Sequence, residues 1–280
     1  MNNILKIAES LFDVQKVQLT TGIDGYNLPE SFGMYRTTGG QCLGTVGNTY
    51  NPTQPAALFD NLIDCLDSQD VDLEKLTYTE MKGGSKIKFT TPFKSVSFKN
   101  IRGQEDESII SINLQTGYDG LTKTSLYLSM FRLICTNGMK ANKTEFTTSF
   151  KNTTGNAGKI GNLCSDVAKS MSMYNDLESI LKTLNGQPVN QKQVTEFLNT
   201  LTGIDITAPD TSTRSKNIYD QMLNSIEIEI QRTGASKWGL LNGITYYTNH
   251  VATAENREEY ILLEKGMTLN NAAFELLTAN

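Results

Sequence analysis

The stretch KIKFTTPFKSVSFKNIRGQEDESIISINLQTGYDGLTKTSLYLSMFRLIC (residues 86–135) decides the predicted fold of this chain. Within it apolar and polar residues alternate, most clearly over residues 108–116, and a period of two is typical of strands that bury one face. Asp119-Gly120 is a tight hairpin signal between two such segments. Together with the strand-like residues 75–81, this stretch predicts an antiparallel meander of four or five strands.

The sequence on either side of the meander adds two short strands and several helices. Residues 32–46 predict two strands that turn at Gly39-Gly40. Beyond Asn137-Gly138 the apolar spacing changes from two to 3.6, and a long helix over 160–184 should stop at Gly186-Gln187-Pro188. Further helices are expected at 3–17, 56–66, 190–201, 215–231, 240–250, 257–263 and 269–277.

The predicted fold class is α+β, with an antiparallel β-meander in the first half and a helical second half. At 280 residues the chain is long enough for a core that needs no covalent staple. We expect a single domain over 1–280. It would comprise an N-terminal helix and loop (1–30), a strand-rich region (31–140) and a helical region (141–280).

Cysteine and histidine usage argues against most kinds of active site. His250 is the single histidine, whereas zinc sites and histidine-based triads usually need more. The cysteines are far apart and form no C-x-x-C pair, which suits reduced thiols better than a disulfide framework. They are Cys42, Cys65, Cys135 and Cys164. We therefore expect no metal, no cofactor and no enzymatic activity.

The hydropathy pattern predicts no membrane-spanning segment. No run of about 18 apolar residues is present, so no transmembrane helix and no membrane partner are expected. The N-terminus, MNNILKIAESLFDVQKV, has charges inside its apolar run and no small-residue cleavage site, unlike a secretory signal. We expect the protein in the cytoplasm of a host cell.

Charge is distributed unevenly along the chain. Overall 25 Lys and Arg face 30 Asp and Glu, but residues 82–159 hold twelve basic and five acidic residues, a net charge of +7. The remainder is therefore −12. From Lys82 to Arg102 there are six cations and no anion. A basic zone inside an acidic protein indicates an anionic partner.

The segment from Lys82 to Arg102 interleaves its cations with Phe89, Phe93 and Phe98. A groove for single-stranded nucleic acid uses this mixture, because cations follow the phosphates and aromatic faces stack on the bases. The alternative is a solvated strand edge, where lysines discourage aggregation and the phenylalanines belong to the core.

Four other motifs have simpler interpretations than catalysis. Gly83-Gly84-Ser85-Lys86 lacks the leading glycine of a phosphate loop and is better explained as a lysine hairpin. Cys135 is interpreted as a buried apolar thiol, and Glu105-Asp106-Glu107 as solvated hairpin residues. The segment 236–250 can stack bases, but a core helix anchored by the sole tryptophan is the favoured interpretation.

The ordered motifs of the chain resemble the phage- and plasmid-associated family catalogued as domain of unknown function 932. The resemblance covers about residues 33–277, and its most specific parts are Tyr-x-Pro-x-Gln and Arg-x-x-Cys-x-Asn. The motifs are Tyr35-Arg36, Leu43-Gly44-Thr45-Val46-Gly47, Tyr50-Asn51-Pro52-Thr53-Gln54, Phe59-Asp60, Gly83-Gly84, Asp119-Gly120, Arg132-Leu133-Ile134-Cys135-Thr136-Asn137 and Trp238…Asn242…Thr245…His250.

This resemblance implies a setting in the replication, recombination or counter-defence of phage or mobile DNA. The layout is also similar, at fold level, to phage single-strand annealing proteins, which bind DNA in a basic groove as rings. One departure stands out: relatives often carry a His-Thr pair where this chain has Lys151-Asn152-Thr153. That difference lowers the expectation of enzymatic chemistry further.

The leading hypothesis is a phage-type protein that binds single-stranded DNA, anneals strands and assembles as a homo-oligomer. Its predicted contact residues are Lys82, Lys86, Lys88, Phe93, Lys94, Phe98, Lys99, Arg102, Arg132, Lys140, Lys143 and Lys151. Changing Lys86, Lys88, Lys94 and Lys99 to Glu should then abolish binding and leave the fold intact.

Three alternatives remain open. The protein could be an interaction module that inhibits a host restriction or defence factor, or binds a phage protein, with its acidic half as the working surface. The basic sheet could instead pack on acidic helices of the same chain and neutralise itself. A hydrolytic enzyme comes last, because one histidine and scattered carboxylates do not assemble into a site.

Overall fold

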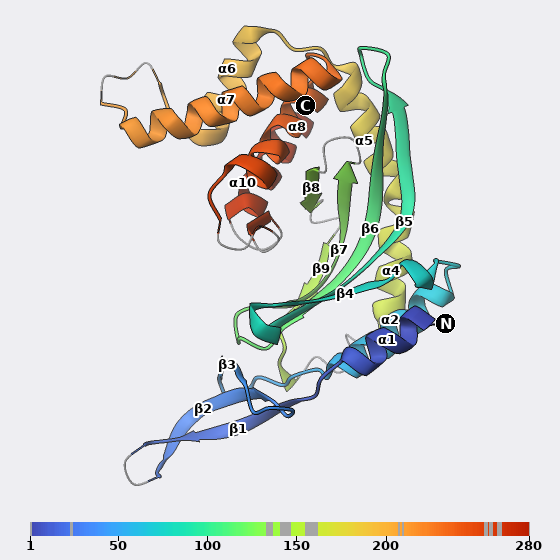
Figure 1. The fold of residues 1–280 in the computed structure, drawn as a ribbon, viewed down its shortest axis with the longest axis vertical. Helices are drawn as coiled ribbons and strands as arrows, with labels where there is room; N and C mark the ends of the chain where they lie inside the picture. The colour runs from blue at the N-terminus through green and yellow to red at the C-terminus, as the bar shows by residue number, and fades with distance from the viewer. Residues whose placement is uncertain are drawn as a thin grey trace. The chain divides into compact units, whose positions relative to one another are not determined.

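The computed structural model confirms the α+β class, with antiparallel sheets in the first half and helices in the second (Figure 1). It describes all residues except 1, 23–24, 133–136, 141–146, 155–161, 207, 209, 255–256, 258–259, 262–264 and 280. For residues 2, 137–140 and 147 it describes the backbone alone. Among the helices in these ranges, none has the length and apolar character needed to cross a bilayer.

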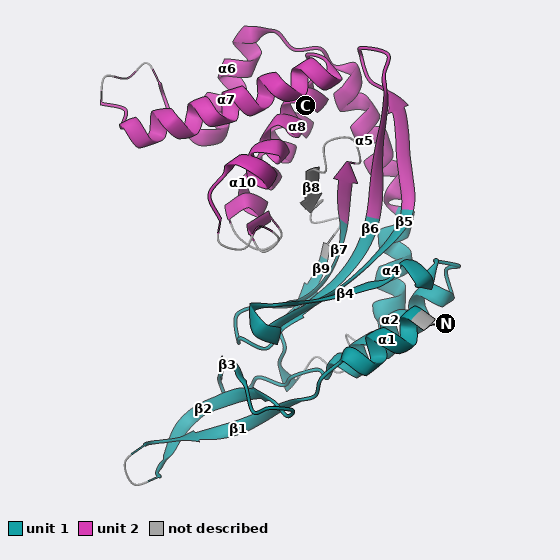
Figure 2. Ribbon diagram, in the orientation of Figure 1, with its two compact units in different colours: residues 1–93, 111–128, 144–172 teal, residues 94–110, 129–143, 173–280 magenta. Residues whose placement is uncertain are grey.

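The chain divides into two compact units (Figure 2). Unit 1 comprises 1–93, 111–128 and 144–172, and unit 2 comprises 94–110, 129–143 and 173–280. The prediction of one domain over 1–280 stays a prediction. Three long strands contribute residues to both units, namely β5 (Lys86–Lys99), β6 (Glu105–Gly117) and β7 (Thr124–Arg132).

These strands belong to a six-stranded sheet with the order β4-β5-β6-β7-β8, and β9 also pairs with β7. The remaining strands are β4 (Thr77–Met81), β8 (Asn137–Lys140) and β9 (Thr147–Phe150). The predicted meander is therefore present, and the predicted hairpin at Asp119-Gly120 joins β6 to β7. β9 lies inside the region that was expected to be helical.

Unit 1 also holds a three-stranded sheet of order β1-β2-β3. Its strands are β1 (Val14–Thr20), β2 (Asn27–Arg36) and β3 (Cys42–Val46). The turn at Gly39-Gly40 is where the sequence predicts it. The first helix, however, is shorter than expected, because α1 spans Asn2–Ser10 and the alternating residues VQKVQLT that follow form β1.

The core of unit 1 lies between its part of the large sheet and helices α1, α2 (Pro55–Asp67) and α4 (Leu163–Ser172) (Figure 1). The rings of Phe59 in α2 and Phe89 in β5 have centroids 5.6 Å apart. Buried residues of β6 on the same face include Ile112 and Leu114. Burial of these apolar side chains stabilises the helix-on-sheet arrangement.

The covering of β5 differs along its length. Ile87, Lys88 and Phe89 are all buried, so both faces of the strand are covered in unit 1. Over residues 92–99, in contrast, Val96 is the one buried residue.

A disulfide joins Cys65 of α2 to Cys164 of α4, with Cα atoms 4.7 Å apart. The prediction of reduced thiols is wrong for this pair. The two residues are 99 positions apart in the sequence, and spacing alone gives no hint that α2 and α4 lie side by side. Cys42 is a free, exposed thiol, and Cys135 lies outside the described residues.

Unit 2 is built largely of helices: α5 (Tyr174–Gly186), α6 (Gln191–Thr202), α7 (Thr213–Thr233), α8 (Lys237–Tyr246), the π-helix η5 (Tyr247–Val251) and α10 (Lys265–Thr278). The predicted long helix over 160–184 is interrupted at Met173, between α4 and α5. A capping box of Asn190 and Gln193 begins α6, and left-handed Gly203 ends it. Trp238 is fully buried, as the core interpretation predicts.

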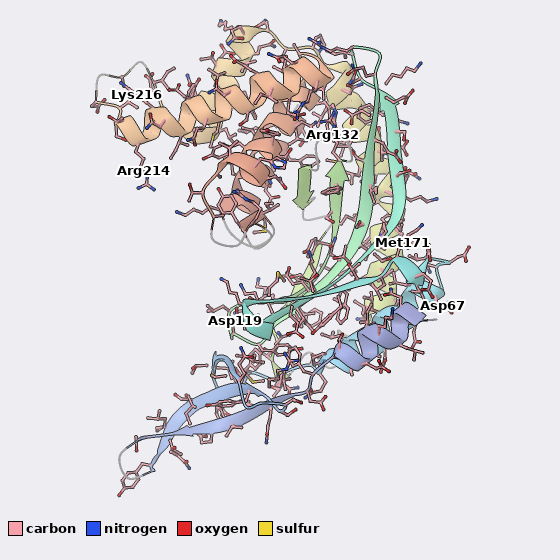
Figure 3. The ribbon with its side chains drawn as sticks, viewed as in Figure 1. Asp67, Asp119, Arg132, Met171, Arg214 and Lys216 are labelled. Carbon is pink, nitrogen blue, oxygen red and sulfur yellow. A yellow bond between two sulfur atoms is a disulfide. The ribbon has the colours of Figure 1, made fainter. Side chains whose placement is uncertain are left out.

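A buried ionic network around Arg132, which Figure 3 labels, ties the strands of unit 2 to its helices. The guanidinium of Arg132 contacts both carboxylate oxygens of Asp106 at 2.6 and 2.8 Å and Glu229 of α7 at 2.8 Å. The indole N–H of Trp238 donates to Asp106 at 3.0 Å. All four residues are at most 1% exposed, so these charges rely on each other for solvation. The interpretation of Asp106 as a solvated hairpin residue is therefore wrong, because its carboxylate is buried in β6.

Removing one charge from this network should therefore be costly. We expect Asp106→Asn to lower the free energy of unfolding by about 3–5 kcal/mol, because Arg132 would lose its closest counter-charge in a buried site. Urea denaturation measures the loss. The control is Glu107→Gln on the exposed neighbour, expected within about 0.5 kcal/mol of the wild type. Equal midpoints for the two variants would contradict the importance of this network.

Candidate functional site

Two of the predicted nucleic-acid contacts, Arg132 and Lys88, are buried. Arg132 is committed to Asp106 and Glu229 in the buried network of unit 2. Lys88 is 7% exposed. A buried side chain that already has partners cannot reach a phosphate, so the assignment of these two residues is corrected. Arg132 is also a specific instance of the self-neutralisation alternative, because a strand cation meets a helix carboxylate of the same chain.

The predicted aromatic contacts are partly buried as well. The ring of Phe98 packs edge-on against Trp238, with centroids 5.6 Å apart. Phe98 therefore extends the core of unit 2, and its assignment as a base-stacking residue is corrected. Phe93 is half-buried.

The remaining cations do not form one demonstrated track. Lys82 and Lys86 belong to unit 1, whereas Lys94, Lys99 and Arg102 are exposed residues of unit 2. The same segment, 94–110, holds two exposed acidic residues, Glu105 and Glu107. The side chains of Lys140 and Lys143 lie outside the described part of the structure. The last predicted contact, Lys151, is exposed in unit 1.

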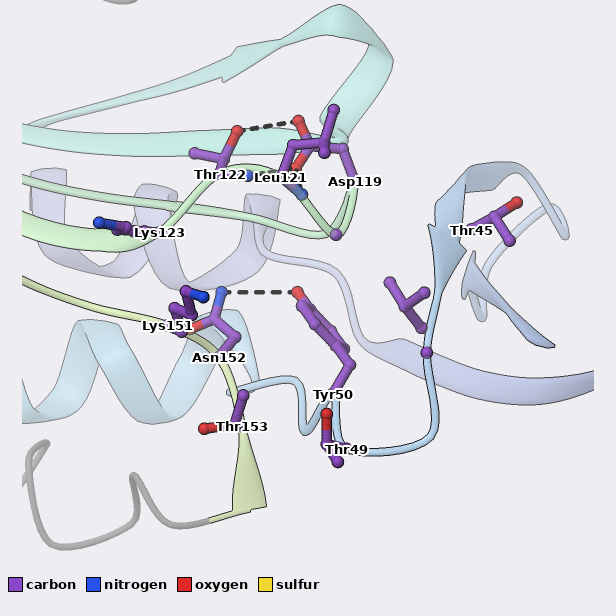
Figure 4. A pocket seen from close by; sticks show the side chains of 13 residues that line it. Thr45, Thr49, Tyr50, Asp119, Leu121, Thr122, Lys123, Lys151, Asn152 and Thr153 are labelled. Carbon is purple, nitrogen blue, oxygen red and sulfur yellow. Dashed lines mark hydrogen bonds between the residues drawn. The ribbon is translucent and has the colours of Figure 1, made fainter. Parts of the chain in front are cut away.

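Lys151 lines a pocket of about 350 Å³ in unit 1 (Figure 4). Three chain segments that are distant in sequence surround this pocket. They are the end of β3 with the loop after it, the turn between β6 and β7, and the residues that follow β9. The lining residues are Thr45, Val46, Gly47, Thr49, Tyr50, Asp119, Gly120, Leu121, Thr122, Lys123, Lys151, Asn152 and Thr153.

Buried hydrogen bonds fix one wall of the pocket. The Tyr50 hydroxyl donates to the carbonyl of Gly117 at 2.6 Å. The Asn152 amide donates to that carbonyl at 3.1 Å and to Thr116 Oγ1 at 3.2 Å, and its oxygen accepts from Thr124 Oγ1 at 2.5 Å. This wall consists of the loop after β3 and the residues after β9, and backbone hydrogen bonds join them. For example, the Asn51 N–H donates to the Asn152 carbonyl at 3.0 Å.

The opposite wall is the Asp119 turn. The Asp119 carboxylate accepts from the backbone N–H groups of Leu121 at 2.9 Å and Thr122 at 2.7 Å, and from the Thr122 hydroxyl at 2.8 Å. Lys86 Nζ lies 3.7 Å from the same carboxylate. These partners occupy and partly neutralise the acidic group, so the turn is held rigidly.

Two glycines lock this turn against β3. A Cβ at Gly44 would lie 2.6 Å from Asp119 Cα, and a Cβ at Gly120 would lie 2.8 Å from the carbonyl oxygen of Thr45. Gly120 also has a φ of +76°, which favours glycine over residues with a side chain. The two backbones therefore approach each other more closely than any other residue permits.

The pocket carries a net positive charge. Lys123 and Lys151 are both exposed, and neither makes an ion pair within the described ranges. Lys86 offsets Asp119, which leaves two uncompensated cations beside the hydroxyls of Thr45, Thr49 and Thr153. Ammonium and hydroxyl groups around a concave surface suit an oxyanion.

Proton-transfer chemistry is not evident at this pocket. Burial raises the pKa of Tyr50 well above its ordinary value, so its hydroxyl stays protonated and serves as a donor to Gly117. Among the residues that the structure describes, no group of three His, Cys, Asp or Glu side chains is placed to hold a metal ion.

Sequence reasoning found Lys151 but missed Lys123 and the threonines of the pocket. A signal was present, because Leu43–Gly47, Tyr50–Gln54 and Asp119-Gly120 were singled out as motifs and these segments meet here. Lys151-Asn152-Thr153, which the sequence analysis also singled out, completes the wall. Their meeting depends on pairing between distant strands, which spacing does not reveal.

The molecule is thus an α+β protein with a basic, hydroxyl-lined pocket on its strand-rich unit. A family model described as "Domain of unknown function (DUF932)" matches residues 42–274, which is 233 of the 280 residues. The chain belongs to this family. Neither curated proteins nor solved structures gave a match.

The glycine contact between β3 and the Asp119 turn can be tested directly. We expect Gly44→Ala to lower the free energy of unfolding by about 1–3 kcal/mol, because the new methyl group would overlap the turn backbone. Gly47→Ala is the control, since a Cβ there meets nothing within 4 Å. Urea denaturation compares them, and a Gly44→Ala variant as stable as Gly47→Ala would show that the contact is not tight.

Proposed function

We propose that this protein binds single-stranded DNA, with the pocket at the Asp119 turn as a principal contact for the phosphate backbone. The observation that supports this most is the pair of uncompensated cations, Lys123 and Lys151, among hydroxyls in a rigid concavity. Backbone phosphates are recognised by such groups without regard to sequence. Lys94, Lys99 and Arg102 remain candidate secondary contacts because they are exposed.

The biological setting belongs to the same proposal. A role in phage or mobile-element replication or recombination, with strand annealing as the activity, extends the family resemblance. A cytoplasmic location is proposed with it. The Cys65–Cys164 disulfide counts against that location, because disulfides are rare in a reducing cytosol.

Homo-oligomerisation is also proposed, but its charge argument changes. One basis for assembly would be attraction between a basic half of one copy and an acidic half of the next. By count over the two units, unit 1 carries 11 basic and 14 acidic residues and unit 2 carries 14 and 16. The charges therefore do not segregate between the units, and head-to-tail attraction of that kind has no support.

A protein-interaction role, as an inhibitor of a host defence factor, is the second candidate. It is favoured by an acidic surface on and after α2. Asp60, Asp64 and Asp67 are exposed on this helix at intervals of four and three residues, which puts them on one face. Exposed acidic residues follow at Asp70, Asp72 and Glu74. A basic protein surface is the partner that such a stripe fits.

The DNA proposal is tested by fluorescence anisotropy with a labelled single strand of roughly 30 nucleotides over a range of salt concentrations. We expect wild-type binding to weaken steeply with salt. Lys123→Ala/Lys151→Ala should bind at least about tenfold more weakly, and should reduce the slope of log K against log salt by about 1.4, since each phosphate contact in a single strand contributes about 0.7.

The matched control is Lys6→Ala/Lys169→Ala, which removes the same charge from exposed positions of unit 1 outside the pocket. It should leave both affinity and slope near wild-type values. If the two double variants lose affinity equally, the effect is general electrostatics and the pocket is not the contact. Absence of wild-type binding at low salt would remove the DNA proposal and favour a protein partner.

A further inference from the structure

Leu121 is an unusual residue on the rim of the pocket. It is 89% exposed, more than any other large apolar side chain in the described ranges. A single exposed leucine ordinarily needs no explanation. This one lines the same pocket as Lys123 and Lys151, and Figure 4 shows it beside Asp119, across the pocket from Tyr50.

The backbone that carries Leu121 is held in place on both sides. Its own N–H donates to the Asp119 carboxylate at 2.9 Å, and the glycine contacts at Gly44 and Gly120 fix the turn against β3. An apolar group on a rigid backbone loses less conformational entropy on contact than one on a mobile loop. The turn backbone therefore holds Leu121 in place before any ligand binds.

We propose that Leu121 contacts an unpaired nucleobase while the lysines of the pocket hold the adjoining phosphate. This inference rests on the proposed function and names its ligand unit, a nucleotide whose base is not in a duplex. The two chemistries of the rim match the two parts of a nucleotide, since bases offer an apolar face and phosphates offer oxyanions. A duplex keeps its bases stacked and offers no such face to a turn.

A membrane surface is the other ligand that combines anionic and apolar chemistry. Stable attachment to a bilayer needs an extended apolar face or several inserted groups. The other exposed large apolar residues of unit 1, namely Leu5, Val17, Tyr26 and Leu28, lie on α1 and the β1–β2 hairpin and do not line the pocket. One leucine is too little for a membrane and sufficient for one base.

The test compares two labelled oligomers of equal length, oligothymidylate and a chain of tetrahydrofuran abasic sites, which has the phosphates without the bases. Leu121→Ala should bind oligothymidylate about threefold to tenfold more weakly than the wild type and bind the abasic chain equally well. Leu5→Ala, which truncates another exposed leucine of unit 1, is the matched control and should change neither affinity. Both truncations are on the surface, so the fold should persist.

The outcomes separate the two proposals. If Lys123→Ala/Lys151→Ala loses binding and Leu121→Ala binds oligothymidylate as the wild type does, the base contact is wrong and DNA binding stands. If the wild type binds neither oligomer, both proposals fail. If Leu121→Ala leaves oligothymidylate binding unchanged and abolishes binding to phosphatidylglycerol vesicles, the residue serves a membrane and the inference is overturned.

Discussion

The close approach of β3 to the Asp119 turn is the constraint on which the candidate site depends. Gly44 and Gly120 allow two backbones to touch where a Cβ would overlap a neighbouring main-chain atom. This contact brings the loop after β3 next to the hairpin that joins β6 to β7. The hydrogen bond from Asn152 to the Tyr50 hydroxyl and the bridge between Tyr50 and Thr153 then join the segment after β9 to the wall that carries Tyr50. The pocket is thus a consequence of strand pairing and glycine placement, and its lysines are carried by a scaffold with little freedom to move.

Much of the fold could be predicted because it follows from local patterns. The alternation over β6, the turn at Gly39-Gly40, the hairpin at Asp119-Gly120 and the caps of α6 are all signals within a few residues of each other. The strand β9 escaped prediction, because it depends on pairing with β7. The disulfide between Cys65 and Cys164 escaped for the same reason, since only the packing of α2 on α4 brings the two thiols together.

The basic zone shows why a count of charges does not locate a binding surface. Arg132, one of the two arginines in this zone, is paired with Asp106 and Glu229 inside unit 2, and Lys88 is buried. Reversing Lys86, Lys88, Lys94 and Lys99 together would therefore disturb buried and paired groups as well as exposed ones, so that set is unsuitable as a test of binding. Cations that remain exposed and unpaired, such as Lys123 and Lys151, are better candidates even though one of them lies outside the segment of highest charge.

The central claim is that the pocket at the Asp119 turn is where a single strand binds. Hydrogen exchange of the full chain, measured by mass spectrometry with and without oligothymidylate, tests it most directly because it locates protection without any substitution. The account predicts slowed exchange in peptides covering 45–50, 119–123 and 151–153, with smaller changes over 94–102. Protection confined to 94–102, or to the helices of unit 2, would contradict the claim and place the binding surface elsewhere.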